Sequence, residues 1–465
     1  MSSRLRFGPT ASLTLLASIV VALLAASSAP TPLYAVYQRE WGFSPITTTV
    51  VFGVYALAVL AALLVFGRIS DHIGRRPVLF AALAGQAAAM VVFATAGSVD
   101  ALLTARVVQG VSTGAALGAI GAGLLDIDRV RGAVANSFAP ATGTATGALI
   151  SGIVVQYLPS PTHLVYLLLL GVFALQALGL VALPESVSRK RGALASMKPD
   201  IGLPRAARGS VAIAAPVLFA VWALAGFYGA LAPGITAGLV HSHSVVYGGL
   251  GLFVFAAAGA LSVLVLRATP TRTVMVLGVI SLIVGVGVTL LSIGSGAGGT
   301  ASVTGFFVGT AVAGVGFGGG FQGGIRLVVP LVEPHERAGV LSLLYVVSYL
   351  GMGVPAVIGG VLVVHGGGLL DTAREYGVAV VVLAAAALAG LLLSGDRTPR
   401  ATGRIVARSG AGPLADAGQP AGPATAAEPV RGPVRQPEPI REPARASVAA
   451  GAEAAEQAAR PAAES

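Results

Sequence analysis

Long apolar stretches, separated by charged residues at irregular intervals, dominate the chain. A transmembrane helix needs about 20 apolar residues to cross roughly 30 Å of hydrocarbon. A charged side chain at the centre of such a helix costs about 2.5 to 3.5 kcal/mol, so each span must fit between two charges. Six charge-free intervals have room for one helix each: Arg6 to Arg39, Glu40 to Arg68, Arg76 to Asp100, Arg106 to Asp126, Arg337 to Asp371 and Glu375 to Asp396.

Three further intervals are long enough for two helices each, and they run from Arg131 to Glu185, from Arg208 to Arg267 and from Arg272 to Arg326. Turn-forming residues break each of them near its middle, in the segments QYLPSPTH, GLVHSHS and IGSGAGG. The pattern therefore predicts an all-α membrane protein with twelve transmembrane helices.

The basic residues between the predicted spans are distributed unequally over the two sides of the membrane. Short cytoplasmic loops carry an excess of Lys and Arg. With a cytoplasmic N-terminus, the outer loops hold two basic residues, Arg39 and Arg374. The cytoplasmic segments then hold seventeen: Arg4, Arg6, Arg68, Arg75, Arg76, Arg129, Arg131, Arg189, Lys190, Arg191, Lys198, Arg205, Arg208, Arg267, Arg272, Arg326 and Arg337. We expect both termini in the cytoplasm and a multi-pass protein of the cell membrane, plasma or inner.

The charged segment in the middle of the chain predicts its division into parts. Residues 1–184 and 211–394 each hold six predicted helices, and the basic residues of 185–210 mark a cytoplasmic connector between two six-helix bundles. Residues 395–465 are rich in Ala, Pro, Gly, Arg and Glu, a composition that buries too little apolar surface to fold. We expect a disordered cytoplasmic tail there, either solvated filler or a segment whose arginines touch anionic lipid.

The composition of the chain excludes several classes of function. Of 465 residues, 55% are hydrophobic and 10% are charged, far fewer charges than soluble domains carry. The formal net charge is +10, but the basic residues are distributed by membrane side and are not gathered into one patch. We therefore expect no nucleic-acid partner. The chain has no cysteine, and it shows no metal-ligand spacing, phosphate-binding loop or catalytic cluster. We expect no metal, no cofactor and no enzymatic activity.

The loop between the second and third predicted helices carries the most informative motif, GRISDHIGRRPVL, from Gly67 to Leu79. Its pattern of Gly67, Asp71, Gly74, Arg75 and Arg76 resembles the signature of the major facilitator superfamily in this loop. His72 stands where many members have a basic residue. The resemblance implies two rocking bundles whose cytoplasmic ends are latched by this loop, with Asp126 at the end of helix four as partner of an arginine. Otherwise, the arginines are only orientation signals.

The fourth predicted helix is similar to a family pattern found in proton-coupled members, through Arg106, Gln109, Gly110 and Gly114. At 1.5 Å per residue, Arg106 lies about 9 Å from Asp100. It therefore either snorkels to the outer interface or faces the central cavity, where with Gln109 it acts in proton coupling or substrate binding.

The fifth predicted helix matches the antiporter pattern of the family only in part. It keeps Gly147 and Gly152, but Ala148 and Ser151 stand where the family pattern has proline and glycine. This departure weakens the case for antiport.

Four residues on helices that line the cavity in the family are candidates for substrate contact: Tyr34, Phe227, Tyr228 and Gln322. The aromatic candidates could equally belong to the belt at the membrane surface.

Apart from Arg106, the predicted spans contain no Asp, Glu, Lys or Arg. Proton coupling would then need Asp71, Asp126, Glu40 or a histidine near a span end, which means His163, His241 or His243; otherwise no proton is coupled. A weakly polar interior suits a lipophilic or drug-like substrate.

The sequence thus predicts a monomeric secondary transporter in the lipid bilayer that exports a small compound in exchange for protons. Two alternatives remain, a uniporter or importer of a small metabolite and a membrane receptor without transport.

Overall fold

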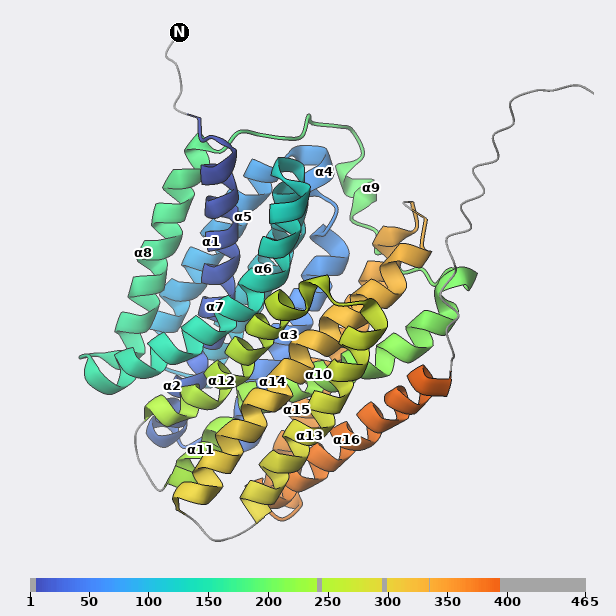
Figure 1. Cartoon of the computed structure of the whole chain (residues 1–465). Coiled ribbons are helices and arrows are strands. Elements are labelled where there is room, and N and C mark those ends of the chain that lie inside the picture. The colour runs from blue at the N-terminus through green and yellow to red at the C-terminus, as the bar shows by residue number, and fades with distance from the viewer. Residues whose placement is uncertain (1–5, 241–244, 295–298, 334, 394–465) are drawn as a thin grey trace, which may run out of the picture. The chain divides into compact units, whose positions relative to one another are not determined.

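The computed structural model describes residues 6–240, 245–294, 299–333 and 335–393, and in these ranges every regular element is helical (Figure 1). Twelve of the helices are long and apolar enough to cross a membrane. The predicted number of spans and the all-α fold are confirmed. The predicted tail lies outside the described residues.

The first half of the chain holds six spans. The first span is made of two helices, and the bounds are α1 Pro9–Ser28 with α2 Pro30–Trp41, α3 Pro45–Phe66, α5 Arg75–Ala94, α6 Val99–Ile127, α7 Arg129–Tyr157 and α8 Pro161–Ala182. The short helix α4 (Ser70–Ile73) lies between α3 and α5, inside the Gly67–Leu79 loop.

The second half also holds six spans: α10 Arg208–Ala230, α12 Val245–Val265, α13 Thr271–Gly294, α14 Thr300–Val328, α15 Arg337–His365 and α16 Leu369–Leu393. The remaining elements are short, namely α9 Ala193–Ser196, α11 Ala232–Val240 and the 3-10 turns η1 Arg205–Ala207, η2 Leu266–Ala268 and η3 Val329–Leu331. Helices α6 and α14 are both 29 residues long, as are α7 and α15. Corresponding spans of the two halves therefore match in length.

The hydrogen-bond ladder of the first span is interrupted at Ala29, where α1 ends and α2 begins, while the backbone of Ala29 itself stays helical, with φ −55° and ψ −38°. We call this interruption the break between α1 and α2. Pro30 and Pro32 follow the break directly. Proline has no backbone N–H, so it leaves the carbonyl four residues earlier without its helical donor. The carbonyl of Ala26 is freed in this way, and it becomes available to a side chain of another helix.

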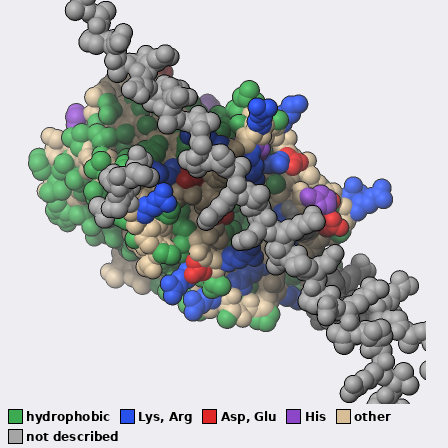
Figure 2. Space-filling view, turned by 90° about the horizontal axis from the view of Figure 1, so that it is seen from above, with side chains coloured by type: hydrophobic (Ala, Val, Ile, Leu, Met, Phe, Trp, Pro, Cys, Tyr) green, Lys and Arg blue, Asp and Glu red, His purple; other side chains and the backbone are tan. Residues whose placement is uncertain are grey.

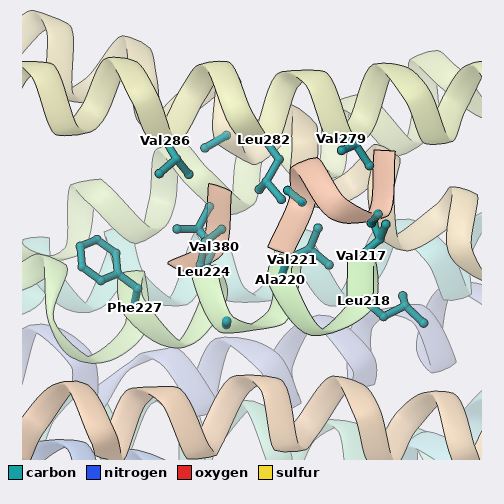
Figure 3. Close-up of a cluster of buried hydrophobic side chains, with 14 of the residues drawn as sticks. Val217, Leu218, Ala220, Val221, Leu224, Phe227, Val279, Leu282, Val286 and Val380 are labelled. Atoms are coloured by element: carbon teal, nitrogen blue, oxygen red, sulfur yellow. The ribbon is translucent and has the colours of Figure 1, made fainter. Parts of the chain in front are cut away.

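The core of the second half lies between α10, α13 and α16. Val217, Val221 and Leu224 of α10 are buried together with Leu282 of α13 and other aliphatic side chains (Figure 3). Between helices in lipid, close van der Waals packing replaces the hydrophobic drive that operates in water.

The two halves pack against each other through α3 with α15 and through α7 with α12. A Cβ atom added to Gly249 of α12 would lie 2.4 Å from the carbonyl oxygen of Ala148 in α7, and one added to Gly360 of α15 would lie 2.0 Å from Oγ1 of Thr49 in α3. All four residues lie in the halves of their helices that are distant from the Gly67–Leu79 loop. We call the membrane side of that loop the motif side, and the opposite side the remote side. The tight glycine contacts between the halves are therefore on the remote side, whereas Leu63, Leu64, Tyr345 and Val346 pack on the α3–α15 cluster nearer the motif side.

We expect Gly249→Ala to separate the two halves on the remote side, because the backbone of Ala148 leaves no room for the methyl group. Thr31, 1% exposed in α2, provides a reporter. Since the chain has no cysteine, Thr31→Cys can be labelled alone with a membrane-impermeant thiol reagent.

Labelling of this cysteine should become several-fold faster in the Gly249→Ala background. Gly287→Ala is the matched control, because a Cβ there meets no atom within 4 Å. Equal labelling rates in the two backgrounds would show that the Gly249 contact does not hold the remote side shut.

Candidate functional site

Arg75 is the centre of a charged cluster on the motif side. It begins α5, and its guanidinium contacts Asp71 Oδ1 at 2.5 Å, Ser70 Oγ at 2.6 Å and Asp126 Oδ2 at 3.3 Å. Its side chain is 10% exposed, whereas those of Asp71 and Asp126 are 53% and 36% exposed. One largely buried guanidinium thus joins the loop to the end of α6.

Glu185, which the sequence did not single out, supports the same cluster from the connector. Its carboxylate accepts hydrogen bonds from the backbone N–H groups of Arg75, at 2.8 Å, and Arg76, at 3.0 Å. These groups have no intrahelical partner at the start of α5, and the helix dipole favours an anion there. Gly74 makes the approach possible, because it has a φ of 102° and a Cβ on it would lie 2.7 Å from Glu185 Oε2.

The connector then crosses from the first half to the second. The backbone N–H of Lys190 donates to the carbonyl of His72 at 2.8 Å, and Arg68 pairs with Asp200 at 3.2 Å. A Cβ on Gly339, near the start of α15, would lie 3.3 Å from Oδ1 of that same aspartate. The hydrogen bonds described for the Gly67–Leu79 loop therefore go to the first half and to the connector, and the connector reaches α15.

Charged side chains gather on the motif side, and Figure 2 shows Lys and Arg beside Asp and Glu on this face. The alternation of both signs fits ion pairs such as Arg68 with Asp200 and Arg75 with Asp126. An exposed pair such as Arg68 with Asp200 is worth about 1 kcal/mol or less, so it can be broken and remade during a conformational change.

Arg106 forms a second polar site, inside the first half. Its side chain is 0% exposed. The guanidinium donates to the hydroxyl of Tyr34 from both Nε, at 3.0 Å, and Nη2, at 2.5 Å, and Nη1 donates to the carbonyl of Ser27 at 2.9 Å and to Oε1 of Gln109 at 2.6 Å. Its Cζ lies 5.2 Å from the ring centroid of Tyr55 and 5.7 Å from that of Phe93. The arginine therefore lies in the interior of the bundle and not at its surface.

The break between α1 and α2 explains why this site can exist. Gln109 Nε2 donates to the carbonyl of Ala26 at 3.0 Å, which is the carbonyl that Pro30 deprives of its helical donor. On the opposite side of the break, Ser151 donates its hydroxyl to the carbonyl of Ala29 at 2.5 Å. Ser151, one of the departures from the antiporter pattern, thus contributes to the same break.

No carboxylate in the described part of the chain contacts Arg106; its partners there are neutral oxygen atoms and aromatic rings. A buried charge without a counter-ion is costly, and this one is compensated by hydrogen bonds and by cation–π contacts. Among the described residues, the buried charged side chains are Arg75 and Arg106.

The other predicted substrate residues lie in the second half, where the rings of Phe227 and Tyr228 are in contact at 5.5 Å between centroids. Tyr228 is 1% exposed and donates its hydroxyl to Thr310 Oγ1 at 3.0 Å, while Phe227 packs against the ring of Tyr376. Gln322 donates from Nε2 to the carbonyl of Val263 at 3.2 Å. The structure therefore places Tyr34 beside Arg106 and Gln109, and it leaves Phe227, Tyr228 and Gln322 in the opposite half.

A cluster of aromatic residues, which the sequence did not single out, lies where the halves meet. Trp222 of α10 contacts Phe317 and Phe321 of α14 and Tyr349 of α15. The same tryptophan packs against the buried cluster that includes Tyr55 of α3. We call Trp222, Phe317, Phe321 and Tyr349 the Trp222 cluster. A single tryptophan among Ala, Val and Leu gives little signal in a sequence, since only the fold unites the three helices.

The remaining candidates for proton coupling are exposed on the surface or lie outside the described residues. Glu40 and His163 are exposed, whereas His241 and His243 lie outside the described residues. Within the described ranges, no group of three or more His, Asp or Glu could hold a metal ion.

Twelve spans in two matched halves, joined by a connector and touching through two helix pairs, define a membrane transporter built from two bundles. The chain belongs to the Major Facilitator Superfamily, whose family model matches residues 15–298. The resemblance drawn from the Gly67–Leu79 loop is thereby confirmed.

Two solved structures of the nucleoside transporter NupG are similar to this chain. One, of a point mutant, aligns with a TM-score of 0.65 and 14% identity and covers 82% of this chain and 100% of that chain. The other gives a TM-score of 0.61 and 13% identity, with 82% and 98% covered. At these identities the similarity shows the fold.

We expect Tyr34→Phe to destabilise the protein, because it removes the oxygen that accepts two N–H groups of Arg106. Leaving buried donors unpaired costs about 1 to 3 kcal/mol, and more when they are charged. The measurement is the thermal unfolding midpoint of the purified protein in detergent.

The matched control for this substitution is Tyr37→Phe, since the hydroxyl of Tyr37 pairs with the neutral hydroxyl of Tyr166 at 3.2 Å. We expect a clearly smaller shift there. Equal shifts in the two variants would mean that Tyr34 does not compensate the buried charge.

We expect Glu185→Ala to lower the unfolding midpoint as well, since loss of a helix cap costs about 0.5 to 2 kcal/mol. Glu375→Ala is the matched control, because Glu375 is exposed in α16. If the midpoint of Glu185→Ala is no lower than that of the control, the Glu185 carboxylate does not stabilise the start of α5.

Proposed function

We propose that this transporter exports a small, weakly polar compound by alternating access, as a monomer in the cell membrane, with the motif side in the cytoplasm. The observation that carries the proposal is the position of the contacts between the halves. The tight glycine contacts lie on the remote side, where Gly249 meets Ala148 and Gly360 meets Thr49. A rocking transporter in such a state takes up its cargo from the motif side.

Protons are the proposed driving ion, and they act on the motif side. The buried charged residues of the described interior are arginines, so the described acids that can exchange a proton lie nearer the surface. Asp71 and Asp126 both contact Arg75. Protonation of either would weaken its hold on the guanidinium and loosen the junction between the loop and α6. Arg106 and Gln109 then shape the polar part of the interior beside the α1–α2 break.

A second candidate function is uptake of a small metabolite without proton exchange. The absence of a buried carboxylate from the described interior favours it, as do Ala148 and Ser151 in place of the antiporter residues. The similar structures are of a nucleoside transporter, which makes nucleosides a reasonable first class of metabolite to test.

The two candidates differ in proton movement. In inverted vesicles with an imposed proton gradient, an exported compound should discharge the gradient when it is added, and Asp71→Asn should abolish the discharge while the protein remains in the membrane. A matched control is Asp100→Asn, because Asp100 lies at the opposite end of α6 from Asp126.

Transport of a radiolabelled compound without any discharge would overturn the proton-driven part and support uptake or uniport. If the Asp71→Asn protein discharges the proton gradient as fast as the wild type, the pairing of Asp71 with Arg75 is not part of proton coupling.

A further inference from the structure

The Trp222 cluster brings four aromatic rings together at the boundary between the two halves. The centroid of the Trp222 ring lies 5.1 Å from that of Tyr349, 5.7 Å from that of Phe321 and 5.9 Å from that of Phe317. The phenylalanine rings meet the indole edge-on or in a T-shape, and the tyrosine ring is tilted by 40°. The rings therefore do not form one compact stack.

Trp222 also carries an unused hydrogen-bond donor. Its Nε1 atom is buried and has no partner among the described residues. The hydroxyl of Ser348, the residue before Tyr349, is likewise buried and unpaired. Buried polar atoms nearly always have partners, and an indole N–H in an apolar site usually finds one.

Other buried aromatic residues of the second half show what an ordinary core position looks like. Tyr228 donates to Thr310 at 3.0 Å, and Tyr376 donates to the carbonyl of Ala223 at 2.7 Å. Trp222 differs in having no such acceptor while its ring remains half-buried. The combination of a half-buried ring and an unpaired donor is typical of a place that an additional molecule completes.

We propose that the Trp222 cluster is the subsite that binds the aromatic part of the transported compound. The ligand is a flat, uncharged aromatic molecule with a hydrogen-bond acceptor, such as a carbonyl oxygen, that pairs with Nε1 of Trp222. It is uncharged because the unpaired N–H of Trp222 favours an acceptor over a cation, and the cluster has no Lys or Arg to compensate an anion. The four rings come from α10, α14 and α15 of the second half, and Trp222 also packs against the buried cluster that includes Tyr55 of α3, so the ligand lies at the boundary of the halves. This inference rests on the transport function proposed above and specifies its substrate class.

The chain allows a direct test because it has two tryptophans, Trp41 and Trp222. In the Trp41→Phe protein all tryptophan emission comes from Trp222. Benzamide is the probe, since it has an aromatic ring and a carbonyl. Cyclohexanecarboxamide keeps the carbonyl without the aromatic ring, and toluene keeps the ring without the acceptor.

Benzamide should change the Trp222 emission in a saturable way, and both control compounds should require several-fold higher concentrations. Saturation-transfer NMR measures the same binding without the fluorophore. In that experiment Trp222→Phe, which keeps an aromatic ring but loses the N–H, should weaken benzamide binding several-fold, and Trp41→Phe should not.

Equal binding of benzamide and cyclohexanecarboxamide would overturn the aromatic subsite, and unchanged binding by Trp222→Phe would overturn the role of its N–H. Either result leaves the vesicle experiment on proton exchange unaffected. Conversely, benzamide binding at Trp222 without proton exchange would retain the subsite and discard the coupling.

Discussion

The burial of the Arg106 guanidinium is the constraint on which the first half of the molecule depends. Its N–H groups need acceptors, and no carboxylate of the described residues contacts it. Tyr34, Gln109 and the carbonyl of Ser27 supply them, and the last of these is next to a helix break. The break, the two prolines that cause it and the aromatic rings around the arginine form one arrangement. Loss of an acceptor from this arrangement leaves a donor of the buried guanidinium unpaired.

The motif side has a different energetic character. Its cluster joins one largely buried arginine to two half-exposed aspartates and to the carboxylate of Glu185. The aspartates are partly exposed to solvent, which screens their pairing with the guanidinium. The connector adds the pair of Arg68 with Asp200 beside Gly339. The buried contacts of Arg106 keep the first half folded, and the exposed ion pairs on the motif side can break. This combination suits a protein that must move one half against the other while both stay folded.

Much of the fold could be predicted from the sequence, because charges mark the limits of spans that lipid permits. The charge-free intervals predicted twelve helices, and turn residues such as those around Pro159 placed the divisions inside the long intervals. The Gly67–Leu79 loop and Asp126 could be singled out because residue type and spacing carry the motif. Glu185 and the Trp222 cluster could not, since their partners are distant in sequence and come together only through tertiary packing. The polar contacts of Arg106 likewise depend on which way a side chain turns on its helix.

The order of the partners of Arg106 along the chain bears on how the protein is made. Ser27, Tyr34, Tyr55 and Phe93 all precede the arginine in sequence, and Gln109 follows it by one helical turn. Domains are synthesised from the N-terminus, so the groups that compensate the charge are present before the helix that carries it is complete. The arginine therefore need not wait in lipid for the second half of the protein. The first six spans can mature as a unit while the ribosome is still translating the rest.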